Sequence, residues 1–122
     1  MPTSFEIGQA GERIVATWLR YRGYTHVKVD TRLPGSTDID AHRVPLMNYL
    51  FPKLFENPKN KERMLVQVKS AVYPHDPGSL SSDEERNITS RAAKIGAQAW
   101  EARVELNSNL ERVGEIRWRK LG

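Results

Sequence analysis

The sequence contains no cysteine among its 122 residues. This absence excludes a disulfide-stabilised scaffold, a zinc site with thiolate ligands and a cysteine nucleophile. Long apolar runs are also missing, because the longest, residues 44–51, contains a proline and an asparagine and is far too short to span a bilayer. The first residues lack the basic start and apolar run of a secretory signal. We therefore expect a cytoplasmic protein with no membrane partner.

The composition that remains is typical of a folded chain with a modest excess of positive charge. Hydrophobic residues make up 39% of the sequence, enough for the core of a single domain over residues 1–122. Lys and Arg number 19 against 15 Asp and Glu, a net charge of +4 that suits a polyanion such as DNA. The basic side chains that we expect to contact nucleic acid form two groups, Lys59, Lys61 and Arg63, and Arg117, Arg119 and Lys120.

The first half of the chain has the signals of one helix and three strands. Thr3 or Ser4 can cap a first helix, and Thr3-x-x-Glu6 has the spacing of a capping box. Gly23 provides a stop, so this helix is predicted to run to about Arg22. Strands are predicted over residues 25–32, 37–44 and 63–70 from their alternating or β-branched residues. Residues 45–62 are too long for a hairpin turn and are interpreted as an insertion with a short helix.

The second half begins with a helix that Ser81 or Ser82 would cap. Its apolar positions alternate steps of four and three over about six turns, which predicts helix as far as Leu106: Ile88, Ala92, Ile95, Ala99, Ala102 and Leu106. The small alanines would allow close approach to a sheet or to a second copy in a homodimer. A final strand is predicted over residues 114–121. The order helix, three strands, helix, strand predicts an α/β fold with a mixed sheet.

Two acidic features stand out against this pattern. Glu12 lies at the edge of the apolar stripe of the first helix, where a carboxylate is usually solvated or salt-bridged. Asp38 and Asp40 project from the same face of a strand, although like charges there repel each other. The two aspartates are consistent either with an exposed sheet face or with ligation of a hard cation such as Mg²⁺, which prefers oxygen ligands.

A third polar feature lies on the strand over residues 63–70. Val66 and Val68 face one side, while Gln67 and Lys69 face the other. A Gln and a Lys on a central strand are costly unless they face a polar site. A Lys beside a phosphate can stabilise developing negative charge, but the same pattern also fits an ordinary half-exposed strand.

Taken in order, these motifs resemble the PD-(D/E)XK nuclease superfamily, which includes restriction endonucleases and archaeal Holliday-junction resolvases. The motifs that carry the resemblance are Gly8-x-x-Gly11-Glu12-Arg13, Gly35-Ser36-Thr37-Asp38-Ile39-Asp40-Ala41 and Gln67-Val68-Lys69. The resemblance covers Gly8 to about Ser70 and implies a restriction-endonuclease-like core with a Mg²⁺ site, in which Mn²⁺ would substitute.

The resemblance also implies roles for individual residues. Asp38 matches the metal-binding Asp, and Gln67 matches the second ligand. The carbonyl of Val68 matches an inner ligand. Lys69 matches the catalytic Lys, and Glu12 matches a helix acid that some members use as a further, often water-mediated ligand.

Two positions depart from the family pattern. Thr37 replaces the Pro of the motif. Gln67 replaces an acid, which removes one negative charge from the site, and we expect Asp40 to supply that charge because it shares a strand face with Asp38.

The function that follows from the resemblance is metal-dependent hydrolysis of DNA by an endonuclease of structural selectivity or low sequence specificity. No nucleotide cofactor is expected, because the sequence has no phosphate-binding loop with Gly-Lys-Ser/Thr. The alternative is a decayed nuclease fold that acts as a nucleic-acid-binding module or as a structural subunit, and Gln67 is the residue that keeps this alternative open.

Overall fold

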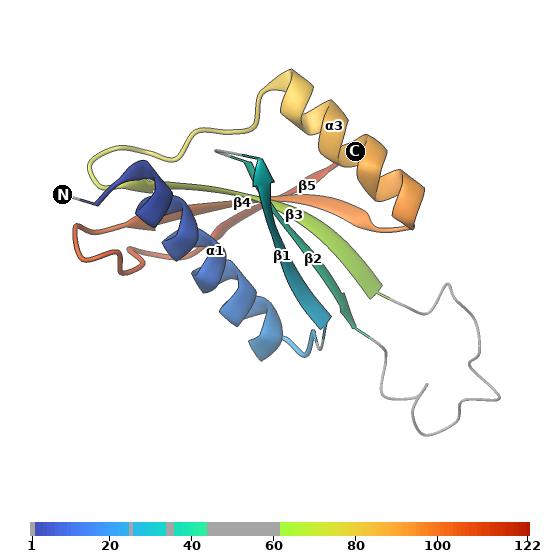
Figure 1. Cartoon of the computed structure of the whole chain (residues 1–122), viewed down its shortest axis with the longest axis horizontal. Coiled ribbons are helices and arrows are strands. Elements are labelled where there is room, and N and C mark those ends of the chain that lie inside the picture. The colour runs from blue at the N-terminus through green and yellow to red at the C-terminus, as the bar shows by residue number, and fades with distance from the viewer. Residues whose placement is uncertain (1, 25, 34–35, 44–61) are drawn as a thin grey trace.

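The computed structural model describes residues 2–24, 26–33, 36–43 and 62–122, with only the backbone for residues 26, 28, 30–33, 36–38 and 62. The predicted insertion over residues 45–62 therefore lies almost entirely outside the described part. The helices and strands are α1 (Ser4–Tyr21), β1 (His26–Leu33), β2 (Ser36–Arg43), β3 (Glu62–Val72), α3 (Ser82–Ile95), β4 (Gln98–Leu106) and β5 (Arg117–Leu121) (Figure 1). The fold is mixed α/β, as the sequence predicts.

The five described strands form one sheet in the order β1-β2-β3-β4-β5. All neighbours are antiparallel except β3 and β4, which run parallel. Parallel neighbours need a crossover, and α3 provides it between β3 and β4 (Figure 1). Among the described helices, none is both long and apolar enough to cross a membrane.

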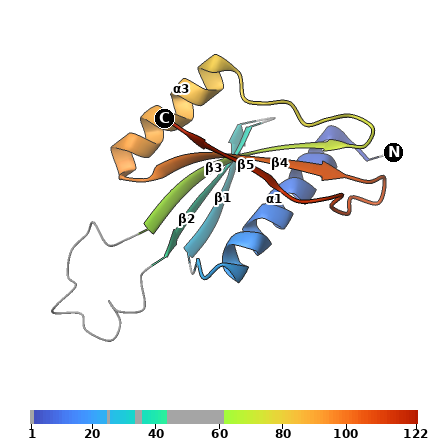
Figure 2. The same cartoon turned by 180° about the vertical axis from the view of Figure 1, so that it is seen from behind.

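The two described helices cover opposite faces of this sheet (Figure 2). On β3, Val66 and Val68 belong to the core cluster that includes Val15 and Leu19 of α1. Leu65 belongs to the second cluster, which includes Ile88 of α3. Because side chains alternate along a strand, the odd-numbered residues of β3 face α3 and the even-numbered residues face α1.

The ends of α1 agree with the sequence prediction. Thr3 and Glu6 form the capping box, with the Glu6 amide donating to Thr3 Oγ1 at 3.2 Å and the Thr3 amide donating to the Glu6 carboxylate at 3.1 Å. The helix ends at Tyr21, and Gly23 follows with a φ of 93°, which a residue with a side chain rarely adopts.

The prediction of one long helix over residues 82–106 was wrong in its second half. The helix ends at Ile95, where Gly96 adopts a left-handed conformation with a φ of 70°, and residues 98–106 form β4. The alanines at 99 and 102 fit helical spacing, but the segment also alternates, and pairing with β3 decides between the two. The proposed alanine stripe for a homodimer is lost, because Ala99 and Ala102 are buried on a strand.

The three tryptophans meet over the α1 face of the sheet. The rings of Trp18 and Trp118 lie 4.9 Å apart between centroids, and those of Trp100 and Trp118 lie 6.2 Å apart in an edge-to-face arrangement. They pack against the core cluster that contains α1. The tryptophans therefore join α1, β4 and β5 on this face.

Candidate active site

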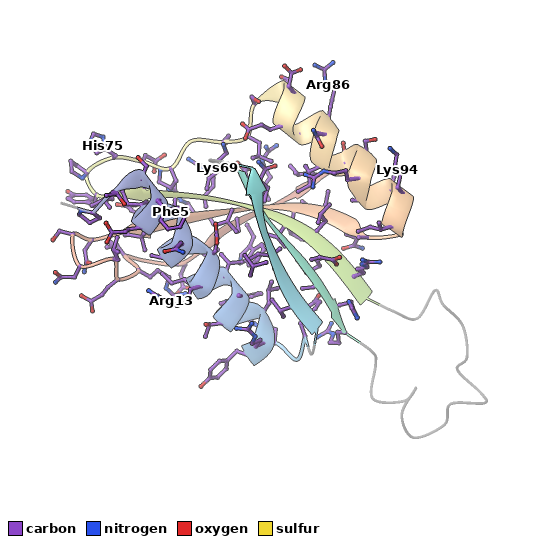
Figure 3. The ribbon with its side chains drawn as sticks, viewed as in Figure 1. Phe5, Arg13, Lys69, His75, Arg86 and Lys94 are labelled. Atoms are coloured by element: carbon purple, nitrogen blue, oxygen red, sulfur yellow. The ribbon has the colours of Figure 1, made fainter. Side chains whose placement is uncertain are left out.

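The polar side chains predicted on β3 lie on the face that α3 covers. Gln67 is only 2% exposed, and Lys69 follows it two residues along the same face. The prediction that they point away from Val66 and Val68 is confirmed, because both contact Glu84 of α3. Lys69 is labelled in Figure 3.

Glu84 connects the two side chains through a single oxygen. Its Oε2 accepts from Lys69 Nζ at 2.7 Å and from Gln67 Nε2 at 3.1 Å. Its other oxygen accepts from the backbone amide of Ser81 at 3.0 Å, and the Glu84 amide donates to Ser81 Oγ. Gln67, Lys69 and Glu84 are called the Glu84 cluster below.

The Glu84 cluster holds a carboxylate in its charged form. Partial burial raises the pKa of Glu84. The hydrogen bonds from Lys69 and from the Ser81 backbone, together with the positive charge of Lys69, lower this pKa by more than burial raises it. The net result is a pKa below the usual value for Glu. The site therefore carries a carboxylate and an ammonium group at neutral pH.

A completely buried carboxylate lies beside the cluster. Glu101 of β4 pairs with Gln67 of β3 in the strand register and is completely buried. Its carboxylate accepts from the Leu80 backbone amide at 2.9 Å and from Arg119 Nε at 2.5 Å. These contacts hold the segment before α3 against the sheet, and with it the turn from which Glu84 projects.

The two predicted aspartates on β2 have different places in the structure. The backbone of Asp38 pairs with Gln67 on β3, so these two residues are direct neighbours across the strands, although the Asp38 side chain lies outside the described part. The carboxylate of Asp40 accepts from Arg63 at 2.9 Å and 2.6 Å. This bidentate contact raises the pKa of Arg63 and gives Asp40 a counter-charge of its own.

Glu12 and Val68 belong to the other face of the sheet. Glu12 is only 8% exposed on α1, and the neighbouring Gly11 packs directly on Ser70 of β3. The Val68 side chain lies in the same core, and its backbone pairs with the strands on either side. The structure therefore does not place Glu12 in the Glu84 cluster.

Three of the four predicted nucleic-acid contacts that the structure describes have partners within the protein. Arg117 donates to Asp76 at 2.6 Å, and this hydrogen bond holds the pKa of Asp76 below its usual value. Arg119 donates to Glu101 and, at 3.4 Å, to Glu85. Of the remaining predicted contacts, Arg63 is bound to Asp40, and Lys120 is exposed. Lys59 and Lys61 lie outside the described residues.

Sequence reasoning missed Glu84 and Glu101 as members of the site. Glu84 has a recognisable signal only as the fourth residue of the capping box Ser81-x-x-Glu84, which explains its backbone contact but not its contact with β3. Glu101 lies in the segment that the sequence predicts as helix and that the structure shows as strand β4. Neither pairing has a signature in local spacing, because the partners are 15 to 21 residues apart.

The oxygen donors of this face suit a hard cation by type. They are the Glu84 carboxylate, the Gln67 amide and, by strand register, the position of Asp38. Within the described part of the chain, no group of three or more His, Cys, Asp or Glu side chains is placed to hold a metal ion.

Comparison with protein-family models, with curated proteins and with solved structures gave no match.

Proposed function

We propose that this protein is a metal-dependent nuclease that hydrolyses phosphodiester bonds in DNA, built on a restriction-endonuclease-like core. The observation that carries the proposal is the Glu84 cluster, in which a carboxylate, an amide and an ammonium group converge beside the backbone of Asp38. The order of elements, with α3 crossing between parallel strands, supports the same fold.

Glu84 can supply the negative charge that is missing at Gln67. The family pattern has an acid at the position of Gln67, and the sequence predicts Asp40 as its substitute. Asp40 is bound by Arg63, whereas Glu84 contacts both Gln67 and Lys69. We therefore assign the missing negative charge to Glu84, which reaches the site from a neighbouring helix.

A magnesium ion at this site would be held by Glu84, Gln67 and Asp38, all oxygen donors. When bound, such an ion supplies positive charge that polarises the phosphate and acidifies water. The affinity in the free protein should be low, because few protein oxygens converge there.

Lys69 provides the remaining chemistry. Its ammonium group has three N–H donors, of which one is directed to Glu84. The side chain is 25% exposed, so a phosphate oxygen or an attacking water can approach it. Lys69 would orient that water and stabilise the negative charge that develops on the phosphate.

The alternative function is a binding module or structural subunit. The ion pair between Lys69 and Glu84 is also consistent with this alternative. Lys69 and Glu84 connect β3 to the start of α3, which is a structural role that needs no substrate. The two hypotheses differ in whether removing the charge of Glu84 affects chemistry or only stability.

The test is cleavage of branched, duplex and single-stranded DNA with and without Mg²⁺ or Mn²⁺. Glu84→Gln should abolish cleavage, because it removes the charge but keeps a side chain that can complete the capping box. Glu85→Gln is the matched control, since this neighbour contacts Arg119 and not the cluster, and it should cleave like the wild type.

Three results would contradict the proposal. Cleavage by Glu84→Gln at the wild-type rate would remove Glu84 from the site. Loss of cleavage in Asp40→Asn but not in Glu84→Gln would show that Asp40, and not Glu84, supplies the negative charge missing at Gln67. A wild-type protein that is inert on all substrates would favour the binding module.

A further inference from the structure

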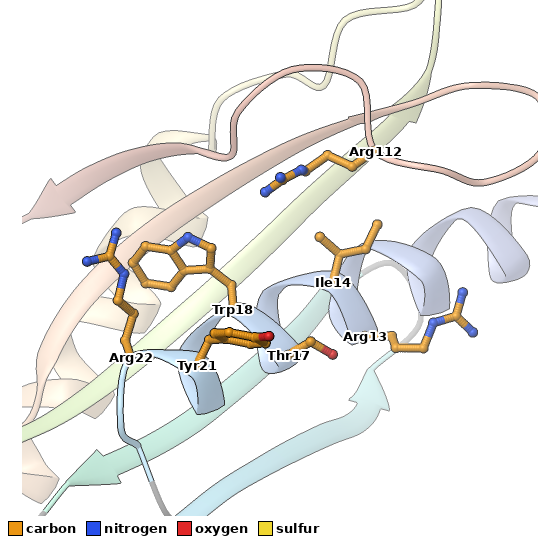
Figure 4. Close-up of a pocket in the computed structure, with 7 residues that line it drawn as sticks. All are labelled: Arg13, Ile14, Thr17, Trp18, Tyr21, Arg22 and Arg112. Carbon is orange, nitrogen blue, oxygen red and sulfur yellow. The ribbon is translucent and has the colours of Figure 1, made fainter.

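A separate groove of about 690 Å³ lies between α1 and the segment after β4 that carries Arg112 (Figure 4). Two stripes of α1, each with residues four apart, line it. Arg13, Thr17 and Tyr21 lie on one stripe, and Ile14 and Trp18 lie on the other, which Arg22 continues directly after the helix. The volume is in the range of ligand-binding pockets, about 300–1,000 Å³.

The groove is positively charged. Arg13, Arg22 and Arg112 line it, no carboxylate does, and none of the three has a salt bridge within the described part of the chain. On α1 itself, Glu6 is at the far end in the capping box, and Glu12 is buried. Three cationic side chains therefore line one open space, and no carboxylate of the described residues lines it with them.

The opposite wall of the groove is held in place by the turn after β4. Asn107 Oδ1 accepts from the backbone amides of Asn109 and Glu111, at 2.9 Å and 3.0 Å. The Asn107 amide donates to the Glu111 carbonyl at 2.8 Å, and Leu106 and Arg112 form an isolated β-bridge. The backbone that carries Arg112 is thus ordered before any ligand arrives.

Aromatic rings accompany the arginines. Tyr21 is 90% exposed, although it lies within the groove lining. The ring of Trp18 is packed against Trp118 on one side, and the guanidinium of Arg22 lies 4.7 Å from its centroid. An exposed ring between cationic groups is the combination that binds bases and phosphates of an unpaired strand.

We propose that this groove binds a segment of single-stranded nucleic acid, with a base stacked on Tyr21 and phosphates paired with Arg13, Arg22 and Arg112. The carboxylates of an acidic chain such as polyglutamate would satisfy the arginines, but Asp and Glu side chains have no flat ring to cover Tyr21. The groove is distinct from the cleavage site proposed above, because α1 and the Glu84 cluster lie on opposite faces of the sheet.

The test is binding of a short labelled oligothymidylate, followed by fluorescence anisotropy in the presence of a chelator so that nothing is cleaved. Tyr21→Ala should weaken binding by about tenfold, within the measured range for loss of one stacked base. Phe5→Ala is the control, because Phe5 is also an exposed aromatic of α1 (70%, Figure 3) but is not among the residues that line the groove. It should leave the affinity unchanged.

The salt dependence tests the charges separately. Three phosphate contacts to a single strand predict a slope of about −2 for the logarithm of affinity against that of salt concentration, and Arg13→Gln should reduce it to about −1.4. Arg20→Gln removes a charge from the same helix outside the groove lining, so it should keep a slope close to that of the wild type.

Four results would overturn this proposal: no binding by the wild type, unchanged affinity in Tyr21→Ala, equal affinity for an abasic oligonucleotide, or equal affinity for polyglutamate. The last would identify an acidic chain as the ligand. A protein that binds the strand but never cleaves DNA would refute the proposed nuclease activity and leave this inference intact.

Discussion

The packing of α1 on β3 depends on the missing side chain of Gly11. A Cβ atom built there would lie 2.7 Å from both Cβ and Oγ of Ser70, and 3.4 Å from a methyl group of Val68. Ser70 is itself held, because its hydroxyl donates to the carbonyl of Ile7 at 3.0 Å. The helix and the strand can approach this closely only with glycine at position 11.

Gly11→Ala should therefore destabilise the protein by about 1–3 kcal/mol, as overpacking does, despite the better helix propensity of alanine. Gly8→Ala is the matched control on the same helix, because its Cβ would meet nothing within 4 Å. It should stabilise the protein by up to about 1 kcal/mol. Urea denaturation of both variants measures the difference, and equal effects would refute the close contact.

At the scale of elements, the Glu84 cluster determines how α3 sits on β3. Lys69 and Gln67 both donate to a residue of the first turn of α3, and Glu101 holds the preceding segment through Leu80. The helix therefore has polar attachments at its start, in addition to the apolar contacts of Ile88 and Ala92.

These attachments predict a pH dependence of stability. The folded-state pKa of Glu84 lies below 4.5, the ordinary value of a Glu side chain, which applies to the unfolded chain. Its contribution is therefore fully present above about pH 4.5 and is lost as the pH falls through the folded-state pKa. Glu84→Gln should cost about 1–2 kcal/mol at neutral pH, as hydrogen bonds to charged groups do.

The measurement is the difference in unfolding free energy between wild type and Glu84→Gln at several pH values. Other carboxylates with lowered pKa values, Glu6 and Asp76, titrate in both proteins and cancel in the difference. The cost of the substitution should shrink as the pH is lowered below 4.5. A difference that stays constant with pH would contradict an ionised Glu84 in the folded protein.

At the scale of the whole molecule, the two faces of the sheet are stabilised differently. The α1 face has a continuous apolar core with three tryptophans against it. The α3 face has a smaller apolar cluster, and next to it the register places Gln67, Glu101 and Arg119 in one row across three strands. A completely buried carboxylate in this row is favourable only while its partners are present.

Arg119→Ala should therefore destabilise the fold by about 3 kcal/mol or more, because Glu101 would retain only the Leu80 amide as a described donor. Lys120→Ala, at an exposed neighbouring position, should change stability by less than about 0.5 kcal/mol. Denaturant unfolding compares the two. Recovery of stability in the double variant Arg119→Ala, Glu101→Gln would identify the unpaired buried charge as the cause.

The sequence by itself determined the local structure wherever one signal dominates. Thr3 and Glu6 specify the start of α1, Ser81 and Glu84 specify the start of α3, and alternation on β3 separates Val66 from Gln67. These features depend on residues within a few positions of each other, so their physical cause is visible in the spacing.

Tertiary structure decided whatever needs a partner from a distant segment. Residues 98–106 satisfy both helical and strand spacing, and the backbone of β3 selects the strand by offering hydrogen bonds along one edge. The same holds for ion pairs. The sequence shows charged residues such as Asp40, Glu84, Arg63 and Arg119, but it does not show which of them form ion pairs with each other or with other residues. Packing of α3 on the sheet brings Glu84 to Lys69, because an attraction between charges acts through space and has no fixed spacing along the chain.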